Sequence, residues 1–309
     1  MIKFLQGDCV EKIKELQDNS IDCVVTSPPY WGLRDYGVDG QLGLEKTYQE
    51  HIQNIVRLFK VLKPKLKDSA TIWLNYGDSY ASTVNGTKAK NIKNDDRGFV
   101  DKPFSTIQGN IKPKDLVMMP NRIAIALQEN GWWIRSEIIW HKPNPMPEST
   151  KDRPTNCHEK LWLITKSKNY YYNADAIKED SIYAPNKTHE KERPKGYYKG
   201  KWSSPEKGSR HDGSFKAIRE KKNKRNVWTI PTKAFKNAHF ATFPPKLIEP
   251  CIKAGCPENG IVLDPFGGAG TTGIVAKSLN RKSILIELNP KYINIAQKRF
   301  QEEFGLFND

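Results

Sequence analysis

A glycine-rich loop near the carboxyl end constrains the fold more than any other feature of this chain. The apolar segment Ile261–Leu263 runs into Asp264-Pro265-Phe266-Gly267-Gly268-Ala269-Gly270, and a helical stretch then extends to about Leu279. A second apolar segment, Ser283–Ile286, ends at Glu287. Three of the glycines fit the G-x-G-x-x-G spacing: Gly268, Gly270 and Gly273. This order of strand, glycine loop, helix, strand and acid indicates a doubly wound α/β sheet that binds a nucleoside cofactor.

The position of this loop predicts an unusual order of the halves of the sheet. Only residues 288–309 follow Glu287, too few for the strands that a dinucleotide-binding fold still requires. The remaining strands must therefore come from the amino-terminal part, with the two halves permuted. No lysine follows the glycines in the manner of a phosphate-binding loop, which argues against a nucleotide triphosphatase.

The second informative segment is Thr26-Ser27-Pro28-Pro29-Tyr30-Trp31, directly after the apolar run Ile21–Val25. The run is typical of a buried strand, and the proline pair ends it because proline has no N–H for a ladder. Ser27 Oγ and the Pro28 carbonyl can accept hydrogen bonds from a planar exocyclic amine, while Tyr30 stacks on the heterocycle that bears it. A plain proline-rich turn with an aromatic lid is the alternative.

Together, Ser27-Pro28-Pro29-Tyr30 and the glycine loop resemble the motifs of S-adenosyl-L-methionine-dependent DNA amino-methyltransferases, which methylate N4 of cytosine or N6 of adenine. The resemblance implies a Rossmann-like methyltransferase sheet with an inserted target-recognition region. It also implies that Asp264 meets the methionine ammonium, Phe266 packs near the adenine and Asp8 binds the adenine amine. Asp8 can equally cap a helix over Cys9–Leu16, and both roles are compatible. The implied cofactor residues are Asp8, Asp264, Phe266, Gly268, Gly270, Thr271, Glu287, His239 and Phe243.

The segment His239–Ile248 resembles the helix-opening motif that closes over the methionine end of the cofactor in this family. An ordinary amphipathic helix starting at the prolines is the alternative. A zinc role for His239 is disfavoured because no second ligand has suitable spacing. We expect no metal.

A basic segment, 178–236, holds 17 Lys and Arg residues against 7 Asp and Glu, with interspersed tyrosines and tryptophans. This composition is typical of a segment that binds a phosphate backbone, although a solvated surface insertion would look similar. We expect phosphate contacts at Lys221, Lys222, Lys224 and Arg225.

Trp31 either lines the pocket for a flipped base or packs in the core. The predicted domains are a catalytic half (1–173), a target-recognition insertion (174–236) and a cofactor half (237–309).

These features predict direct methyl transfer to a flipped base in double-stranded DNA. Such a transfer needs no covalent enzyme intermediate, because orientation and fixed dipoles can supply the rate. In the family, Ser before Pro-Pro tends to mark N4-cytosine enzymes, so the resemblance favours cytosine; N6-adenine is the alternative. An RNA or protein methyltransferase and an inactive DNA-binding partner remain rivals. A cognate restriction endonuclease acting on the same site is a candidate partner, and we expect a monomer or homodimer.

Composition sets the remaining limits. The net charge is +15, and no apolar run approaches 18 residues, which predicts a cytoplasmic, DNA-associated protein of prokaryotic or phage origin without membrane contact. Five cysteines without a Cys-x-x-Cys pair predict free thiols. The segment from Val84 to Lys114 is polar and basic and predicts a long surface loop.

Overall fold

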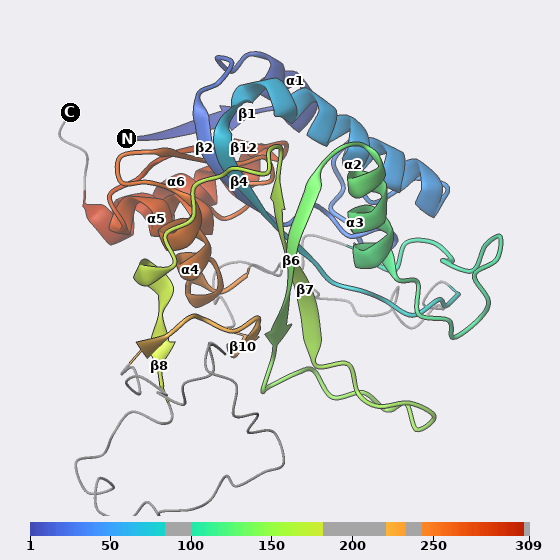
Figure 1. Cartoon of the computed structure of the whole chain (residues 1–309). Coiled ribbons are helices and arrows are strands. Elements are labelled where there is room, and N and C mark those ends of the chain that lie inside the picture. The colour runs from blue at the N-terminus through green and yellow to red at the C-terminus, as the bar shows by residue number, and fades with distance from the viewer. Residues whose placement is uncertain (84–99, 182–220, 233–242, 306–309) are drawn as a thin grey trace, which may run out of the picture. The chain divides into compact units, whose positions relative to one another are not determined.

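The computed structural model describes residues 1–83, 100–181, 221–232 and 243–305 (Figure 1). The chain divides into two units. The larger unit combines Met1–Asn173 with Arg225–Asp309, and the smaller unit is Ala174–Lys224. Both ends of the chain therefore contribute to one folding unit, as the permuted order of the halves requires.

The larger unit is built on an eight-stranded sheet with the order β1-β12-β11-β2-β4-β7-β6-β10. Its strands are β1 (Ile2–Gln6), β2 (Ile21–Thr26), β4 (Leu66–Tyr76), β6 (Trp133–His141), β7 (His158–Thr165), β10 (Val227–Thr229), β11 (Ile261–Asp264) and β12 (Lys282–Glu287). Strand β7 runs antiparallel to both of its neighbours, and the other neighbouring pairs are parallel. The predicted mostly parallel α/β sheet is thus confirmed.

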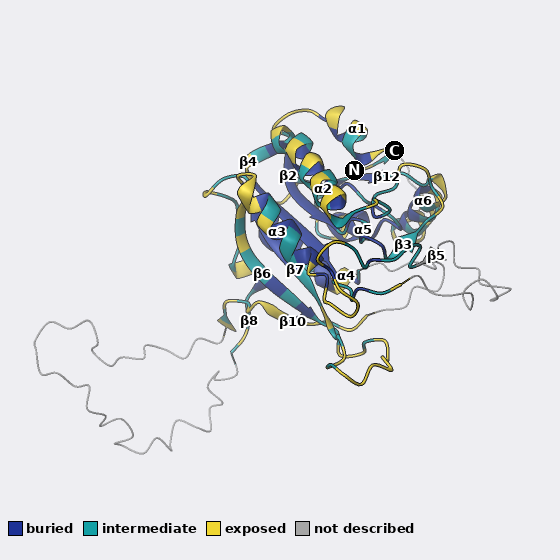
Figure 2. Cartoon of the chain, turned by 90° about the vertical axis from the view of Figure 1, so that its right-hand side faces the viewer, coloured by how far each residue is buried: buried dark blue, intermediate teal, exposed yellow. Residues whose placement is uncertain are grey.

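Helices cover both faces of this sheet (Figures 1 and 2). One face carries α1 (Cys9–Lys14), α2 (Tyr48–Leu62) and α3 (Met119–Glu129), and the other carries α4 (Pro245–Gly255), α5 (Thr271–Ser278) and α6 (Pro290–Phe304). The neighbouring strands β2 and β11 lead to helices on opposite faces. The chain therefore diverges beyond their carboxyl ends, where open α/β sheets form a ligand-binding crevice.

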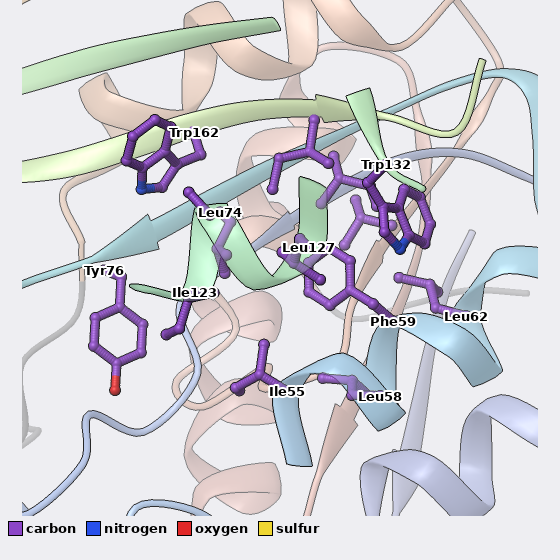
Figure 3. Packing of buried hydrophobic residues seen from close by; sticks show 14 of the residues in the cluster. Ile55, Leu58, Phe59, Leu62, Leu74, Tyr76, Ile123, Leu127, Trp132 and Trp162 are labelled. Atoms are coloured by element: carbon purple, nitrogen blue, oxygen red, sulfur yellow. The ribbon is translucent and has the colours of Figure 1, made fainter. Parts of the chain in front are cut away.

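Helix α2 shows how the sequence specifies its own packing. It begins with a capping box, in which Thr47 and Glu50 each bond the other's backbone N–H. Ile55, Phe59 and Leu62 recur at helical spacing, and all three are buried. They face Ile123 and Leu127 of α3, and the Phe59 ring meets the Trp132 ring edge-on with centroids 5.4 Å apart (Figure 3). The apolar spacing of this segment therefore coincides with its buried face.

Short elements complete the fold. Strands β3 (Arg34–Asp35) and β5 (Val100–Asp101) pair antiparallel, as do β8 (Glu179–Asp180) and β9 (Lys221–Lys222) in the smaller unit. Two 3₁₀ turns occupy Lys63–Lys65 and Asp175–Ile177. Of the long loop expected up to Lys114, residues 84–99 lie outside the described residues.

Strand β10 corrects the predicted limit of the inserted region at residue 236. Val227, Trp228 and Thr229 pair with Ile139, Trp140 and His141 of β6, so this stretch forms the edge of the main sheet. Trp228 is 5% exposed and lies beside Trp73, with ring centroids 6.5 Å apart. The basic composition of the surrounding segment concealed a three-residue strand, which carries too little periodicity to be recognised alone.

None of the helices in the described ranges combines the length and the apolar composition that crossing a membrane requires.

Candidate active site

A cavity of about 560 Å³ lies at the carboxyl edge of the main sheet. Its walls come from both halves of the chain, since Ser27–Tyr30 after β2 and Asp264–Ala269 after β11 line the same space. Segments that follow β1, β12, β6 and β10 add to it. The predicted catalytic corner and the predicted cofactor loop therefore share one cavity, as the topology of the sheet requires.

Asp264 joins the two halves of this cavity. Its Oδ1 accepts hydrogen bonds from Thr26 Oγ1 at 2.7 Å and from the Phe266 N–H at 3.1 Å. Its Oδ2 accepts one from Thr272 Oγ1 at 2.6 Å. Burial raises the pKa of Asp264, and the two hydroxyls and the backbone N–H oppose that effect. Three of about four acceptor positions are filled, leaving one on Oδ2. Contact of that position with the methionine ammonium stays a prediction.

The glycine loop is held against Glu287. Glu287 Oε2 accepts the Gly268 N–H at 2.9 Å, and its Oε1 accepts the Asn289 N–H at 2.8 Å. Gly268 has φ +48°, and a Cβ there would meet only the Phe266 carbonyl at 3.9 Å, so its backbone faces open space. Burial raises the pKa of Glu287. Each carboxylate oxygen keeps a further lone pair, which fits the two hydroxyls of a ribose.

Gly270 belongs to the glycine loop but packs against helix α6. It has φ +79° at the start of α5, and a Cβ there would lie 2.9 Å from the Ala296 Cβ of α6. It does not line the cavity, whereas Thr271, Phe266 and Phe243 do. This geometry gives Gly270 a role in shaping the loop, and its predicted contact with the cofactor stays a prediction.

Asp8 caps helix α1 and also lines the cavity, and its contact with the adenine amine stays a prediction. Its Oδ1 accepts the Glu11 N–H at 3.0 Å and caps α1, while the residue also lines the cavity. The preceding Gly7 N–H bonds the Glu287 carbonyl at 3.0 Å, which places the two acids at one wall. His239 lies outside the described residues.

The catalytic corner is held by a directed chain of hydrogen bonds. Ser27 Oγ donates to Tyr30 Oη at 3.3 Å, and Tyr30 Oη donates to Glu159 Oε2 at 2.8 Å. Burial and the Glu159 carboxylate raise the pKa of Tyr30, so the phenol keeps its proton and remains a donor. One face of the Tyr30 ring stacks on Tyr76, with centroids 4.4 Å apart. Because the Ser27 hydroxyl proton is directed at Tyr30, the remaining lone pairs of Ser27 are acceptors.

Among the cavity-lining side chains that the sequence reasoning did not select are Asn75, Trp140, Lys142 and Glu159. Asn75 Nδ2 donates to Glu159 Oε2 at 3.1 Å, and Lys142 Nζ forms a short ion pair with Glu159 Oε1. Glu159 stands near the amino end of β7, and only because β7 is antiparallel does that end reach the carboxyl edge of its neighbours. The sequence carries no signal of this reversed direction.

Trp31 is a core residue, which corrects its predicted contact with DNA. It is 2% exposed, and its ring packs beside Tyr48 and Phe104 with centroids 6.1 Å and 5.7 Å away. Its Nε1 donates to the Glu45 carbonyl at 3.0 Å. An indole enclosed on these sides cannot stack on a base, so the alternative of core packing is the one that the structure supports.

The basic residues Lys221 and Lys222 form β9 of the smaller unit, where Lys222 lies 3.7 Å from the Glu179 carboxylate. Lys224 and Arg225 stand at the boundary between the two units. Contact of these four residues with DNA phosphates stays a prediction. All five cysteines are free thiols, and among the described residues no three His, Cys, Asp or Glu side chains gather as a metal site would require.

Comparison with known proteins gives a consistent result. The sequence profile of a DNA methylase family, N6_N4_Mtase, matches residues 21–298. The chain is 43% identical to the type II methyltransferase M.Cfr9I of Citrobacter freundii, over 97% of this chain and 88% of that protein. It is 42% identical to M.SmaI of Serratia marcescens, over 96% of this chain and 90% of that protein.

Solved structures share the fold at low sequence identity. The PvuII DNA methyltransferase, described as cytosine-N4-specific, aligns with a TM-score of 0.64 and 19% identity over 100% of this chain and 87% of its own. A putative DNA modification methylase of Thermus thermophilus, solved with S-adenosyl-L-methionine, aligns with a TM-score of 0.61 and 20% identity. That alignment covers 99% of this chain and 96% of the other.

Proposed function

The chain belongs to the DNA methylase family, and on that premise we propose that it methylates the exocyclic N4 of cytosine in duplex DNA, with S-adenosyl-L-methionine as the methyl donor. The observation that carries the proposal is the single cavity lined by Ser27–Tyr30 and by the glycine loop. Because both segments line the same cavity, the methyl donor and the target base can bind next to each other there.

The residues of the cavity fit the donor. Phe266 offers an apolar ring, the Gly268 backbone faces open space, and Glu287 keeps acceptor positions for two hydroxyls. The last free position on Asp264 Oδ2 suits an ammonium group. When bound, S-adenosyl-L-methionine supplies a sulfonium methyl group that an amine can attack directly.

The catalytic corner prepares the amine for this attack. An exocyclic amine is a weak nucleophile because its lone pair is delocalised into the ring. Ser27 Oγ, left as an acceptor by its donation to Tyr30, and the Pro28 carbonyl would hold the two N–H groups and favour a pyramidal nitrogen. The new N–C bond forms as the S–C bond breaks, and the amine then loses one proton. Orientation and fixed dipoles supply the rate enhancement.

Access to the amine requires the base to leave the helix, because its Watson–Crick edge is paired in duplex DNA. The Tyr30 ring is backed by Tyr76 on one face, and the residue remains partly exposed at the cavity. A ring supported in this way is a rigid platform on which a flipped base can stack. The basic character of the chain supports duplex DNA as the substrate.

The choice of cytosine rests on Ser27 before the proline pair and is supported by the cytosine-N4-specific description of one structural neighbour. The test is mass spectrometry of nucleosides from duplex DNA incubated with the protein and the donor. We expect N4-methylcytosine in treated DNA and none with Ser27→Ala. If the product is N6-methyladenine instead, the choice of cytosine as the target base is wrong, while the proposed methyltransferase activity stands. Labelled methyl transfer to structured RNA but not to duplex DNA would overturn the substrate class.

A further inference from the structure

Lys142 is a cation fixed at the wall of the catalytic cavity. It follows β6, and its backbone N–H bonds the Cys157 carbonyl at 2.8 Å. The segment after it is tied to the segment that follows β10, where Asn144 and Thr232 exchange two hydrogen bonds of 2.9 and 3.1 Å. The Lys142 ammonium lies 4.4 Å from the centre of the Trp140 ring, which is itself held by a hydrogen bond to the Ile230 carbonyl. The charge is therefore held in place from several sides.

The Glu159 carboxylate orients the Lys142 ammonium. Both lone pairs of its Oε2 are taken by Tyr30 Oη and Asn75 Nδ2, and its Oε1 accepts Lys142 Nζ. The carboxylate is thus committed to neighbouring side chains and has little capacity left for a ligand. Its side chain is 17% exposed and that of Lys142 is 19% exposed, and both line the cavity.

The ammonium keeps donors to spare. It has three N–H groups, and among the described residues Glu159 is the acceptor that it contacts. Tyr30 and Glu159 link Ser27, the expected acceptor of the target amine, to Lys142. Both Ser27 and Lys142 line the cavity, so a base bound by its amine at Ser27 can present its neighbouring ring edge to Lys142.

That edge differs between the two candidate bases. Beside the amine, cytosine has N3 and then the O2 carbonyl, two adjacent acceptors, whereas adenine has N1 and then an apolar C–H. An ammonium with two remaining N–H groups matches the pair of acceptors in cytosine. We propose that Lys142 donates to the N3 and O2 edge of the flipped cytosine and so selects this base. This inference rests on the proposed function, because it assumes that a base enters the cavity with its amine at Ser27.

The test compares Lys142→Met with the wild-type protein on matched duplexes. One duplex carries cytosine at the target position and the other carries 3-deazacytosine, which keeps the amine and O2 but replaces the N3 acceptor by a C–H. Lys166→Met removes a lysine outside the cavity, whose Nζ bonds the Leu66 carbonyl, and serves as the control for lost charge. Single-turnover methyl transfer is measured, with donor affinity measured separately.

We expect the wild-type and Lys166→Met proteins to lose about 10- to 100-fold in rate on 3-deazacytosine, as for a lost hydrogen bond to a charged group. Lys142→Met should transfer methyl to cytosine more slowly than the wild type does. Its rate should fall by only about twofold or less when 3-deazacytosine replaces cytosine. Its affinity for the donor should be retained. Changes in amine reactivity caused by the analogue affect every variant equally and cancel in this comparison.

Three results would overturn the inference. In the first, Lys142→Met remains as sensitive to the analogue as the wild type. In the second, its defect is equal on both duplexes and follows salt concentration, which indicates a phosphate contact. In the third, the wild-type protein methylates both duplexes equally, a result that stands even if the variant fails to fold. Failure of the proposed function looks different, because the wild-type protein would then form no N4-methylcytosine at all.

Discussion

Replacement of Thr26 by Val tests whether the bond between Thr26 and Asp264 holds the two halves of the active site together. Valine keeps nearly the same shape and removes only the hydroxyl that donates to Asp264 Oδ1 at 2.7 Å. Thr26 is 3% exposed and Asp264 is 1% exposed, so water cannot replace the lost donor. A hydrogen bond to a charged group contributes about 1.5–3 kcal/mol, and we expect the free energy of unfolding to fall by about that much near neutral pH.

The loss should depend on pH in a definite direction. Burial raises the pKa of Asp264 in the folded protein above its unfolded value of about 3.9. Between these two values the folded state binds more protons than the unfolded state, so stability falls as pH rises. Removing the Thr26 hydroxyl, which favours the ionised form, raises the folded pKa further. The stability difference between wild type and variant therefore grows as pH rises through the raised pKa.

Urea unfolding at pH values below and above the raised pKa of Asp264, followed by tryptophan fluorescence, measures both effects. Thr165→Val is the matched control, since Thr165 is buried and donates to the Ser167 carbonyl at 2.8 Å, a neutral acceptor. It should cost about 1 kcal/mol, with no dependence on pH. Equal losses for the two variants, or a Thr26→Val loss that does not change with pH, would refute the assignment of Asp264 as the charged link.

Three further substitutions separate the roles in the cavity. Gly270→Val places a β-branched residue at φ +79° and against Ala296, so calorimetry should detect no binding of S-adenosyl-L-methionine; retained binding would contradict the packing argument. Tyr30→Ala should slow methyl transfer by at least about 100-fold with donor affinity within about twofold, because the ring positions the base and not the donor; a loss of donor affinity instead would reverse the roles. Tyr76→Phe removes the hydroxyl that accepts the Trp31 N–H and bonds His51 Nε2, both at 2.9 Å. It should lower the free energy of unfolding by about 1–3 kcal/mol and slow transfer, and unchanged urea unfolding would show that this buried network does not hold the corner.

Parts of the site could be derived from the sequence because local chemistry determines them. The apolar run of β2 and the proline pair that ends it depend only on neighbouring residues, and so do the glycine loop and the amphipathic face of α2. Their order along the chain required the sheet to be permuted. From these elements followed the mostly parallel sheet and the shared cavity for the catalytic corner and the cofactor loop.

Other features were decided only by the tertiary structure, because they depend on which distant atoms become neighbours. Asp264 bonds Thr26, a residue most of the chain away, and Trp31 packs in the core, one of the two roles that its sequence position left open. Glu159 enters the cavity because β7 runs against its neighbours, and there it pairs with Lys142, which follows β6. A strand's apolar pattern is the same in either direction, so neither its orientation nor the side chains at its ends can be assigned until the sheet has formed.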